Sequence, residues 1–177
     1  MSTSGKSGRT AGITVRRATR ADLAAVLDCL AAAFASYESR YTAAAFRDTV
    51  LTADAAERRL RDMTILVAED PAEGIVGTIA LAAAGAGEGH LRGMAVRPRH
   101  QGLGIADRLL HAGEEELRSL GCTRVTLDTT RPLERAIRFY ERCGYRATGL
   151  VKDFFGMPLF EYAKDLAGGP QAFRPSS

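Results

Sequence analysis

The chain has 177 residues, 46% of them hydrophobic, so it can bury a full core and a single domain is expected. Its 24 basic and 21 acidic residues leave a formal net charge of +3, an excess too small and too dispersed for a nucleic-acid-binding surface. No apolar run reaches the roughly 18 residues of a membrane-spanning helix. We therefore expect neither nucleic acid nor a membrane as a partner.

The N-terminal third combines a leader, a short strand and several helices. Residues 1–12 are rich in Ser, Gly and Thr and are predicted to be a disordered leader. A first edge strand is expected over residues 13–17, followed by a helix over residues 20–36 whose apolar residues recur at helical spacing. Further helical segments are predicted over residues 42–50 and 54–61.

The middle of the chain is rich in β-formers. Residues 64–69, 75–83 and 90–96 are separated by turn-forming residues and are predicted to form an antiparallel meander. A strongly periodic helix follows over residues 105–120 and is expected to end at Gly121.

The next strand, over residues 124–129, is reached through that helix. A helical crossover makes a strand parallel to the one before it, so the sheet should contain one parallel pair. Pro132 suits the first turn of a helix that ends at Cys143, with Gly144 as its C-terminal cap.

Two final strands, residues 147–152 and 159–166, are expected to flank an apolar loop over residues 153–158. The tail, residues 167–177, is predicted to be disordered, which leaves residues 13–166 as the folded domain. This order predicts an α/β fold with a mixed sheet of about six to seven strands, mostly antiparallel, flanked by about four helices.

The three cysteines lack metal-ligand spacing and are predicted to be small buried hydrophobic residues: Cys29, Cys122 and Cys143. Their odd number and the lack of a signal peptide favour a cytoplasmic location. We expect no metal site.

The segment Gln101–Ala106 joins a predicted strand to a predicted helix through a glycine-rich turn. Such a turn gathers free backbone N–H groups at the positive end of the helix, which suits a phosphate. A Cβ at Gly102 or Gly104 would hold the ligand's oxygens away from the amides. A P-loop or a dinucleotide fold is weakly supported, because the lysine of the first and the third glycine of the second are missing. The basic residues before the turn either contact phosphates or are solvated: Arg97, Arg99 and His100.

This segment resembles motif A of the GNAT superfamily, the acyl-CoA N-acyltransferases. The residues that carry the resemblance are Val96, Pro98, Gln101, Gly104 and Ala106. Residues 136–145 resemble the family's later helix and Gly-aromatic turn, and the likeness extends over roughly residues 13–166. It implies a sheet in which the two parallel strands splay apart and admit the pantetheine arm of coenzyme A.

The resemblance also implies acetyl-CoA as co-substrate. The implied coenzyme A-binding residues are Met94, Ala95, Val96, Gln101, Gly102, Leu103, Gly104, Ile105 and Ala106. Amides of the turn would hold the pyrophosphate, while Leu103 and Ile105 pack into the core. Backbone groups of Met94 and Val96 would bind pantetheine, and one of those amides would polarise the thioester carbonyl. Leu133 stands where relatives often have an asparagine that contacts coenzyme A.

Tyr140 stands where the family often has the tyrosine that protonates the leaving sulfur. A phenol can protonate a thiolate without being ionised at neutral pH. The alternative is a tyrosine that only packs its helix on the sheet.

The general base has three candidates. Histidine is a competent base near neutral pH, and His90 stands where many relatives carry a glutamate; Glu88 or a water-mediated route are the alternatives. Period-2 alternation predicts one strand face with His90, Arg92, Met94 and Val96, and the other with Leu91, Gly93 and Ala95. Arg92 is expected to bind a carboxylate of the acceptor.

Acceptor-side residues are expected from the first helices and the final loop: Tyr37, Tyr41, Phe46, Phe154, Phe155, Met157 and Phe160. Aromatic residues exposed in that loop would indicate an apolar acceptor or a homodimer contact. The resemblance implies an N-acetyltransferase that acts on a primary amine of a small metabolite by direct attack. The alternatives are acetylation of a protein N-terminus or lysine, and a non-catalytic acyl-CoA-binding module that regulates a partner.

Overall fold

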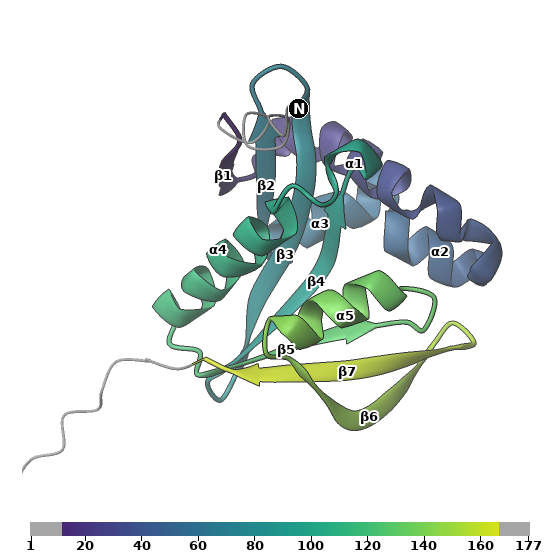
Figure 1. Cartoon of the computed structure of the whole chain (residues 1–177), viewed down its shortest axis with the longest axis vertical. Coiled ribbons are helices and arrows are strands. Elements are labelled where there is room, and N and C mark those ends of the chain that lie inside the picture. The colour runs from purple at the N-terminus through teal and green to yellow at the C-terminus, as the bar shows by residue number, and fades with distance from the viewer. Residues whose placement is uncertain (1–11, 167–177) are drawn as a thin grey trace, which may run out of the picture.

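The computed structural model describes residues 12–166, and almost all of the predicted leader and the whole predicted tail lie outside the described residues. Seven strands form one mixed sheet in the order β1-β2-β3-β4-β5-β7-β6 (Figure 1). The strands are β1 (Thr14–Arg17), β2 (Thr64–Asp70), β3 (Gly74–Gly85), β4 (Glu88–Val96), β5 (Arg124–Thr129), β6 (Arg146–Phe154) and β7 (Met157–Asp165). The α-helices are α1 (Leu23–Phe34), α2 (Ala43–Val50), α3 (Ala53–Asp62), α4 (Ile105–Ser119) and α5 (Glu134–Arg142). The predicted fold class is confirmed.

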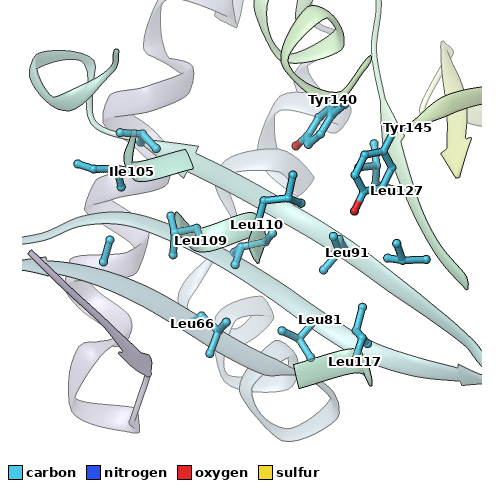
Figure 2. Packing of buried hydrophobic residues seen from close by; sticks show 14 of the residues in the cluster. Leu66, Leu81, Leu91, Ile105, Leu109, Leu110, Leu117, Leu127, Tyr140 and Tyr145 are labelled. Carbon is cyan, nitrogen blue, oxygen red and sulfur yellow. The ribbon is translucent and has the colours of Figure 1, made fainter. Parts of the chain in front are cut away.

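Helices cover both faces of the sheet. Helices α4 and α5 lie on one face and α1, α2 and α3 on the other (Figure 1). Each face has its own apolar cluster, because every helix presents one apolar stripe to the sheet. Figure 2 shows the first cluster, in which Ile105, Leu109 and Leu117 of α4 pack on Leu81 and Leu91 of the sheet.

Strands β4 and β5 form the parallel pair and then separate. They are paired only from Glu88 with Arg124 to Leu91 with Leu127, although β4 continues to Val96. Neighbouring strands that lose their ladder leave backbone groups without partners from the sheet. The predicted splayed pair is therefore confirmed.

A β-bulge interrupts β4 next to this separation. The pairs that bracket it are Thr78 with Ala95 and Ala80 with Arg92. Two residues, Gly93 and Met94, thus face a single residue of β3. Gly93 has φ +63°, a left-handed conformation that glycine adopts without strain.

The bulge makes the predicted alternation along β4 wrong beyond Arg92. The residues on the α4 side are Leu91, Met94 and Val96. Those on the α1–α3 side are His90, Arg92 and Ala95. One extra residue in a strand moves every later side chain to the opposite face.

Two further boundaries differ from the predictions. Helix α5 begins at Glu134, because Pro132 lies in a turn closed by the Leu133 amide, which donates to the Thr130 carbonyl at 3.1 Å. The predicted loop over residues 153–158 is a tight hairpin turn at Phe155 and Gly156, both with positive φ, which matches the right-handed twist of the flanking strands.

Candidate active site

A cavity of about 640 Å³ passes through the sheet where β4 and β5 separate. On one face it is lined by the loop after β4 and by α4 and α5. On the other face it is lined by residues of α1, α2 and α3. The cavity therefore offers one site that reaches both faces of the sheet, as an extended co-substrate and a separate acceptor require.

Free amide groups gather where the cavity meets the start of α4. Among residues 12–166, no acceptor takes a hydrogen bond from the backbone N–H groups of residues 102–107; the first amide in the helix with a partner is Arg108, which donates to Gly104 at 3.2 Å. The helix N-terminus adds partial positive charge at this point. The geometry suits an anion such as a diphosphate.

Two glycines shape this turn. Gly102 and Gly104 have φ +75° and +79°, and a Cβ built on either meets nothing within 4 Å. Glycine is required there by its backbone conformation, and the space beside the amides is open. The side chain of Gln101 stabilises the turn. Its amide group donates to the Val96 carbonyl at 3.0 Å and accepts from Arg135 at 3.1 Å.

Most of the residues implied for coenzyme A line the cavity. Backbone or side-chain atoms of Met94, Ala95, Val96, Gln101, Gly102, Gly104, Ile105 and Ala106 line the cavity. Leu103 does not; it packs on the core, and Ile105 is buried, as expected for their side chains. Arg97 donates to the Ile75 carbonyl at 2.9 Å and so does not face the cavity, as Arg99 does not. Three arginines of α5 do line it and were missed: Arg135, Arg138 and Arg142.

Tyr140 of α5 lies in the cavity wall, packed beside Phe139 and Tyr145 (Figure 2). Its side chain is almost fully buried, and its hydroxyl has no hydrogen-bond partner among residues 12–166. Burial raises the pKa of the phenol well above its usual value. At neutral pH Tyr140 is therefore a protonated donor with a free hydroxyl.

His90 faces the cavity from the other side of the sheet. Its Nδ1 lies 2.9 Å from Thr126 Oγ1, and that hydroxyl also donates to the Gly89 carbonyl at 3.4 Å. When this hydroxyl donates its proton to the Gly89 carbonyl, it accepts from Nδ1–H and the lone pair of the imidazole lies on Nε2. Desolvation lowers the pKa of His90, while the carboxylate of Asp128, 3.8 Å from Nε2, partly opposes that shift. The imidazole is thus neutral and able to accept a proton near pH 7.

Glu88 does not share this position. Its carboxylate is bound by Arg124 at 2.6 Å, and it does not line the cavity. It lies at the start of β4, two residues before His90, where β4 and β5 are still paired. The carboxylate of Glu88 thus lies outside the cavity that His90 lines, and a guanidinium already binds it.

A charged cluster borders the cavity on the α1–α3 side of the sheet. Arg92 of β4 donates to Asp48 of α2 at 3.3 Å, and Arg59 of α3 lines the same wall. Desolvation, and then the neighbouring charge of Arg92, lower the pKa of Arg59 to about 10. The guanidinium of Arg59 is therefore still cationic at pH 7.

Of the expected acceptor-side residues, only Tyr37, Tyr41 and Phe154 line the cavity. The other four do not: Phe46, Phe155, Met157 and Phe160. The tight hairpin between β6 and β7 leaves Phe155 exposed on the surface. Leu133, at the position of the family's asparagine, lines the cavity with an apolar side chain.

Several cavity residues were missed from the sequence. Asp128 lines the cavity, and Thr126 contacts His90 beside it. Both alternate with Val125 and Leu127 along β5, so their common face could have been found. Asp48 and Arg59 lie on helices far from β4 in the chain, and no local pattern marks them.

Within residues 12–166, no group of three or more His, Cys, Asp or Glu side chains is placed to hold a metal ion. In the same part of the chain, no helix combines the length and apolar composition needed to cross a membrane.

Comparison with known proteins gives a consistent result. Residues 25–145 match the family model of the acetyltransferase (GNAT) family. A glucosamine 6-phosphate N-acetyltransferase from Trypanosoma brucei brucei is 32% identical over 96 residues, which cover 51% of this chain and 63% of that protein. The chain thus spans less than two thirds of the length of that relative.

Two solved structures share the fold. An acetyltransferase of the GNAT family from Staphylococcus aureus Mu50 has a TM-score of 0.71 at 18% identity, covering 87% of this chain and 99% of that one. A PaiA N-acetyltransferase from Thermoplasma acidophilum in complex with coenzyme A has a TM-score of 0.69 at 19% identity, covering 88% of this chain and 99% of that one.

Proposed function

The chain belongs to the GNAT family of acetyltransferases, and on that premise we propose that it transfers the acetyl group of acetyl-CoA to a primary amine of a small metabolite by direct attack. One observation carries the proposal: a single cavity connects the free amides at the start of α4 with Tyr140 and His90. Binding, proton donation and proton acceptance are thereby available in one space.

The residues present fit coenzyme A. The amides of residues 102–107 would hold its diphosphate, and the arginines of α5 that line the same cavity would meet its other phosphate. The separated strands offer β4 backbone groups near the bulge to the pantetheine arm. Acetyl-CoA, when bound, supplies an acetyl group activated as a thioester.

Each catalytic side chain has one proton to move. Nε2 of His90 takes the proton that the attacking amine loses as its nitrogen bonds to the acetyl carbon. The hydroxyl of Tyr140 donates a proton to the sulfur as the carbon–sulfur bond breaks. An amide of the β4 bulge polarises the carbonyl oxygen. Thr126 and Asp128 act through His90, as positioning residues.

A small amine is favoured over a protein as acceptor because the acceptor side is walled by Tyr37 and Tyr41, from the segment after α1, and by Phe154 of β6. Such a walled pocket buries most of a small ligand. The relative from Trypanosoma is also named for a small-molecule amine.

Location and assembly are further parts of the proposal. Three free cysteines, two of them buried, support the cytoplasm as the location. The exposed apolar residues of the β6–β7 hairpin support contact with a second copy: Leu150, Val151 and Phe155.

A thiol-release assay with acetyl-CoA over a panel of amines, an N-terminal peptide and a lysine peptide tests the proposal. We expect release with small amines and little with the peptides. Release with a peptide alone would favour the protein acceptor. Stabilisation by acetyl-CoA without any release would favour a non-catalytic module.

A further inference from the structure

The part of the cavity wall beside the β4 bulge holds more positive than negative charge. Arg59 and Arg92 both line it, and Asp48 is the carboxylate beside them. Arg92 makes a long hydrogen bond to Asp48 at 3.3 Å. Among residues 12–166, no side chain or carbonyl accepts a hydrogen bond from the guanidinium of Arg59, and no carboxylate lies within 4.0 Å of it. One positive charge of this wall therefore lacks a protein counter-ion.

Arg59 is held where the reaction is proposed to occur. Its Nη1 lies 2.7 Å from the position that a Cβ on Gly93 would take, so the guanidinium rests on the β4 bulge. The bulge lies where β4 leaves β5 and the cavity crosses the sheet. Any larger residue at position 93 would displace the guanidinium as well as strain the backbone.

Such an arrangement is costly without a ligand. A guanidinium that has lost part of its hydration and lies close to another cation is destabilised until an anion replaces the lost contacts. The planar group presents several N–H donors, a geometry that matches the paired oxygens of a carboxylate or a phosphate. A neutral acceptor would leave these donors unsatisfied.

The opposite end of the same space carries a carboxylate. Asp128 lies near Nε2 of His90, at 3.8 Å, on the β5 side of the cavity. Asp128 also accepts from Lys152 at 3.1 Å, so an amine or ammonium group that approaches the base shares this carboxylate with the lysine. The wall is thus polarised, with a carboxylate near the proposed base and guanidinium groups near the bulge.

We infer that Arg59 and Arg92 bind an anionic group, a carboxylate or a phosphate, carried by the amine that the enzyme acetylates. The inference rests on the proposed function. It adds a substrate class, amines that also carry a negative charge, and it assigns Arg59 a role in specificity.

Pairs of amines that differ only in charge test the inference. Glucosamine 6-phosphate is compared with glucosamine in one arm, and β-alanine with its amide in the other, by kcat/KM of thiol release. We expect the anionic member to be preferred by about tenfold or more in at least one arm, since a hydrogen bond to a charged group contributes about 1.5–3 kcal/mol. The arm that shows the preference identifies phosphate or carboxylate.

Variants test whether the preference for the anionic amine depends on Arg59 itself or on a general change in the enzyme. Arg59→Gln should reduce the preference by lowering kcat/KM about tenfold to a hundredfold more for the anionic member than for the neutral member. Asp48→Asn should increase the preference because it removes the competing carboxylate. Arg58→Gln, on an exposed neighbour in the same helix, is the matched control and should change neither member.

Calorimetric binding of the same pairs to the coenzyme A-bound protein gives a readout without turnover. Equal affinity for both members of each pair, or an Arg59→Gln variant that keeps the preference, would overturn the inference. Absence of thiol release with every amine, together with tighter binding of the anionic members, would instead refute the proposed reaction and leave the anion site standing.

Discussion

The hydroxyl of Tyr140 is the group we expect to be most sensitive to a one-atom change. Tyr140→Phe should lower kcat about a hundredfold, the usual contribution of a positioned proton donor. Stability should change little, because the hydroxyl has no hydrogen-bond partner among the described residues and the ring keeps its packing. Thiol-release kinetics and urea unfolding measure the two effects.

Tyr145 provides the matched control, since its ring packs against that of Tyr140 at a centroid distance of 5.8 Å. Its hydroxyl donates to the buried carboxylate of Glu114 at 2.9 Å. Tyr145→Phe should therefore lower the free energy of unfolding by about 1–3 kcal/mol and leave kcat unchanged. An unchanged kcat in Tyr140→Phe would exclude the proposed proton donor.

We expect the protonation of His90 to cause a fall in kcat/KM at low pH, the acid limb of the pH profile. Only the neutral imidazole accepts a proton, and burial lowers its pKa from the model-peptide value of about 6.5. Above pH about 6.5, His90 stays neutral and we expect its ionisation to have no effect on kcat/KM. Below that value, protonation of His90 should lower kcat/KM. His90→Gln should remove this limb and lower the rate about a hundredfold or more.

The pH profiles of the unaltered protein and of His90→Gln are measured with the same acceptor, so the ionisation of the acceptor affects both equally. His111→Gln, on an exposed face of α4, should keep the normal profile. Thr126→Val should weaken the acid limb without abolishing activity, because it removes the partner that holds Nδ1. If the His90→Gln profile coincides with the normal one, a water-mediated route replaces the histidine.

At this scale the sequence predicts residues that carry chemistry of their own better than residues that act through others. His90 and Tyr140 were singled out and do line the cavity, although their roles stay predictions. Glu88 was the alternative base after His90, but its ion pair with Arg124 depends on a strand that is distant in the chain. Arg59 was not predicted as a site residue for the same reason, because it lies on α3, which is distant in the chain from β4.

Among the elements, the N-terminus of α4 is the one that we expect to bind phosphate. Gly104→Ala should raise the Kd for acetyl-CoA about tenfold, because the new Cβ would project into the open space beside the free amides. The left-handed backbone at φ +79° should also lower the free energy of unfolding by about 1–2 kcal/mol.

Gly121 at the other end of α4 allows the two effects to be separated. It has φ +83°, a Cβ there also meets nothing within 4 Å, and it does not line the cavity. Gly121→Ala should therefore cost a similar free energy of unfolding and leave the Kd unchanged. Equal Kd values in both variants would show that the phosphates bind elsewhere.

Element types follow from the sequence more closely than element details do. Every predicted helix and strand exists, since apolar periodicity and turn residues act locally. The β4 bulge could not be predicted from β4 alone, because it is a mismatch in register with β3. The β6–β7 turn was predicted too long. Residues 153 and 154 belong to β6 and pair with residues 158 and 157 of β7, and this pairing is not visible in the local sequence.

For the whole molecule, the consequential feature is that the sheet is incomplete between β4 and β5. The parallel pair was predictable from the helical crossover, whereas the separation of its strands was implied only by the family resemblance, and the place where they separate was not predicted. Local patterns carry no information on where a ladder ends in three dimensions. The cavity, which depends on that place, was accordingly beyond sequence reasoning.

A ligand that fills this gap should stabilise the two halves of the sheet together. Acetyl-CoA at a hundred times its Kd contributes about 2.7 kcal/mol, which for a domain of this size raises Tm by about 5–10 °C. Adenosine 3′,5′-bisphosphate reaches only the α4 amides, and pantetheine reaches only the gap between β4 and β5. We expect each fragment alone to stabilise much less than the whole molecule, because linking them makes the second contact intramolecular.

Thermal unfolding with the two fragments, singly and mixed, against acetyl-CoA measures this linkage. Hydrogen exchange should report protection at residues 92–96 with acetyl-CoA and not with the nucleotide fragment, since only the pantetheine arm would contact the separated part of β4. Gly121→Ala should keep the full shift in Tm on adding acetyl-CoA, and Gly104→Ala should lose part of it. A nucleotide fragment that stabilises the protein as much as acetyl-CoA would mean that the gap is not filled, and the bulge of β4 would then have no part in binding the thioester.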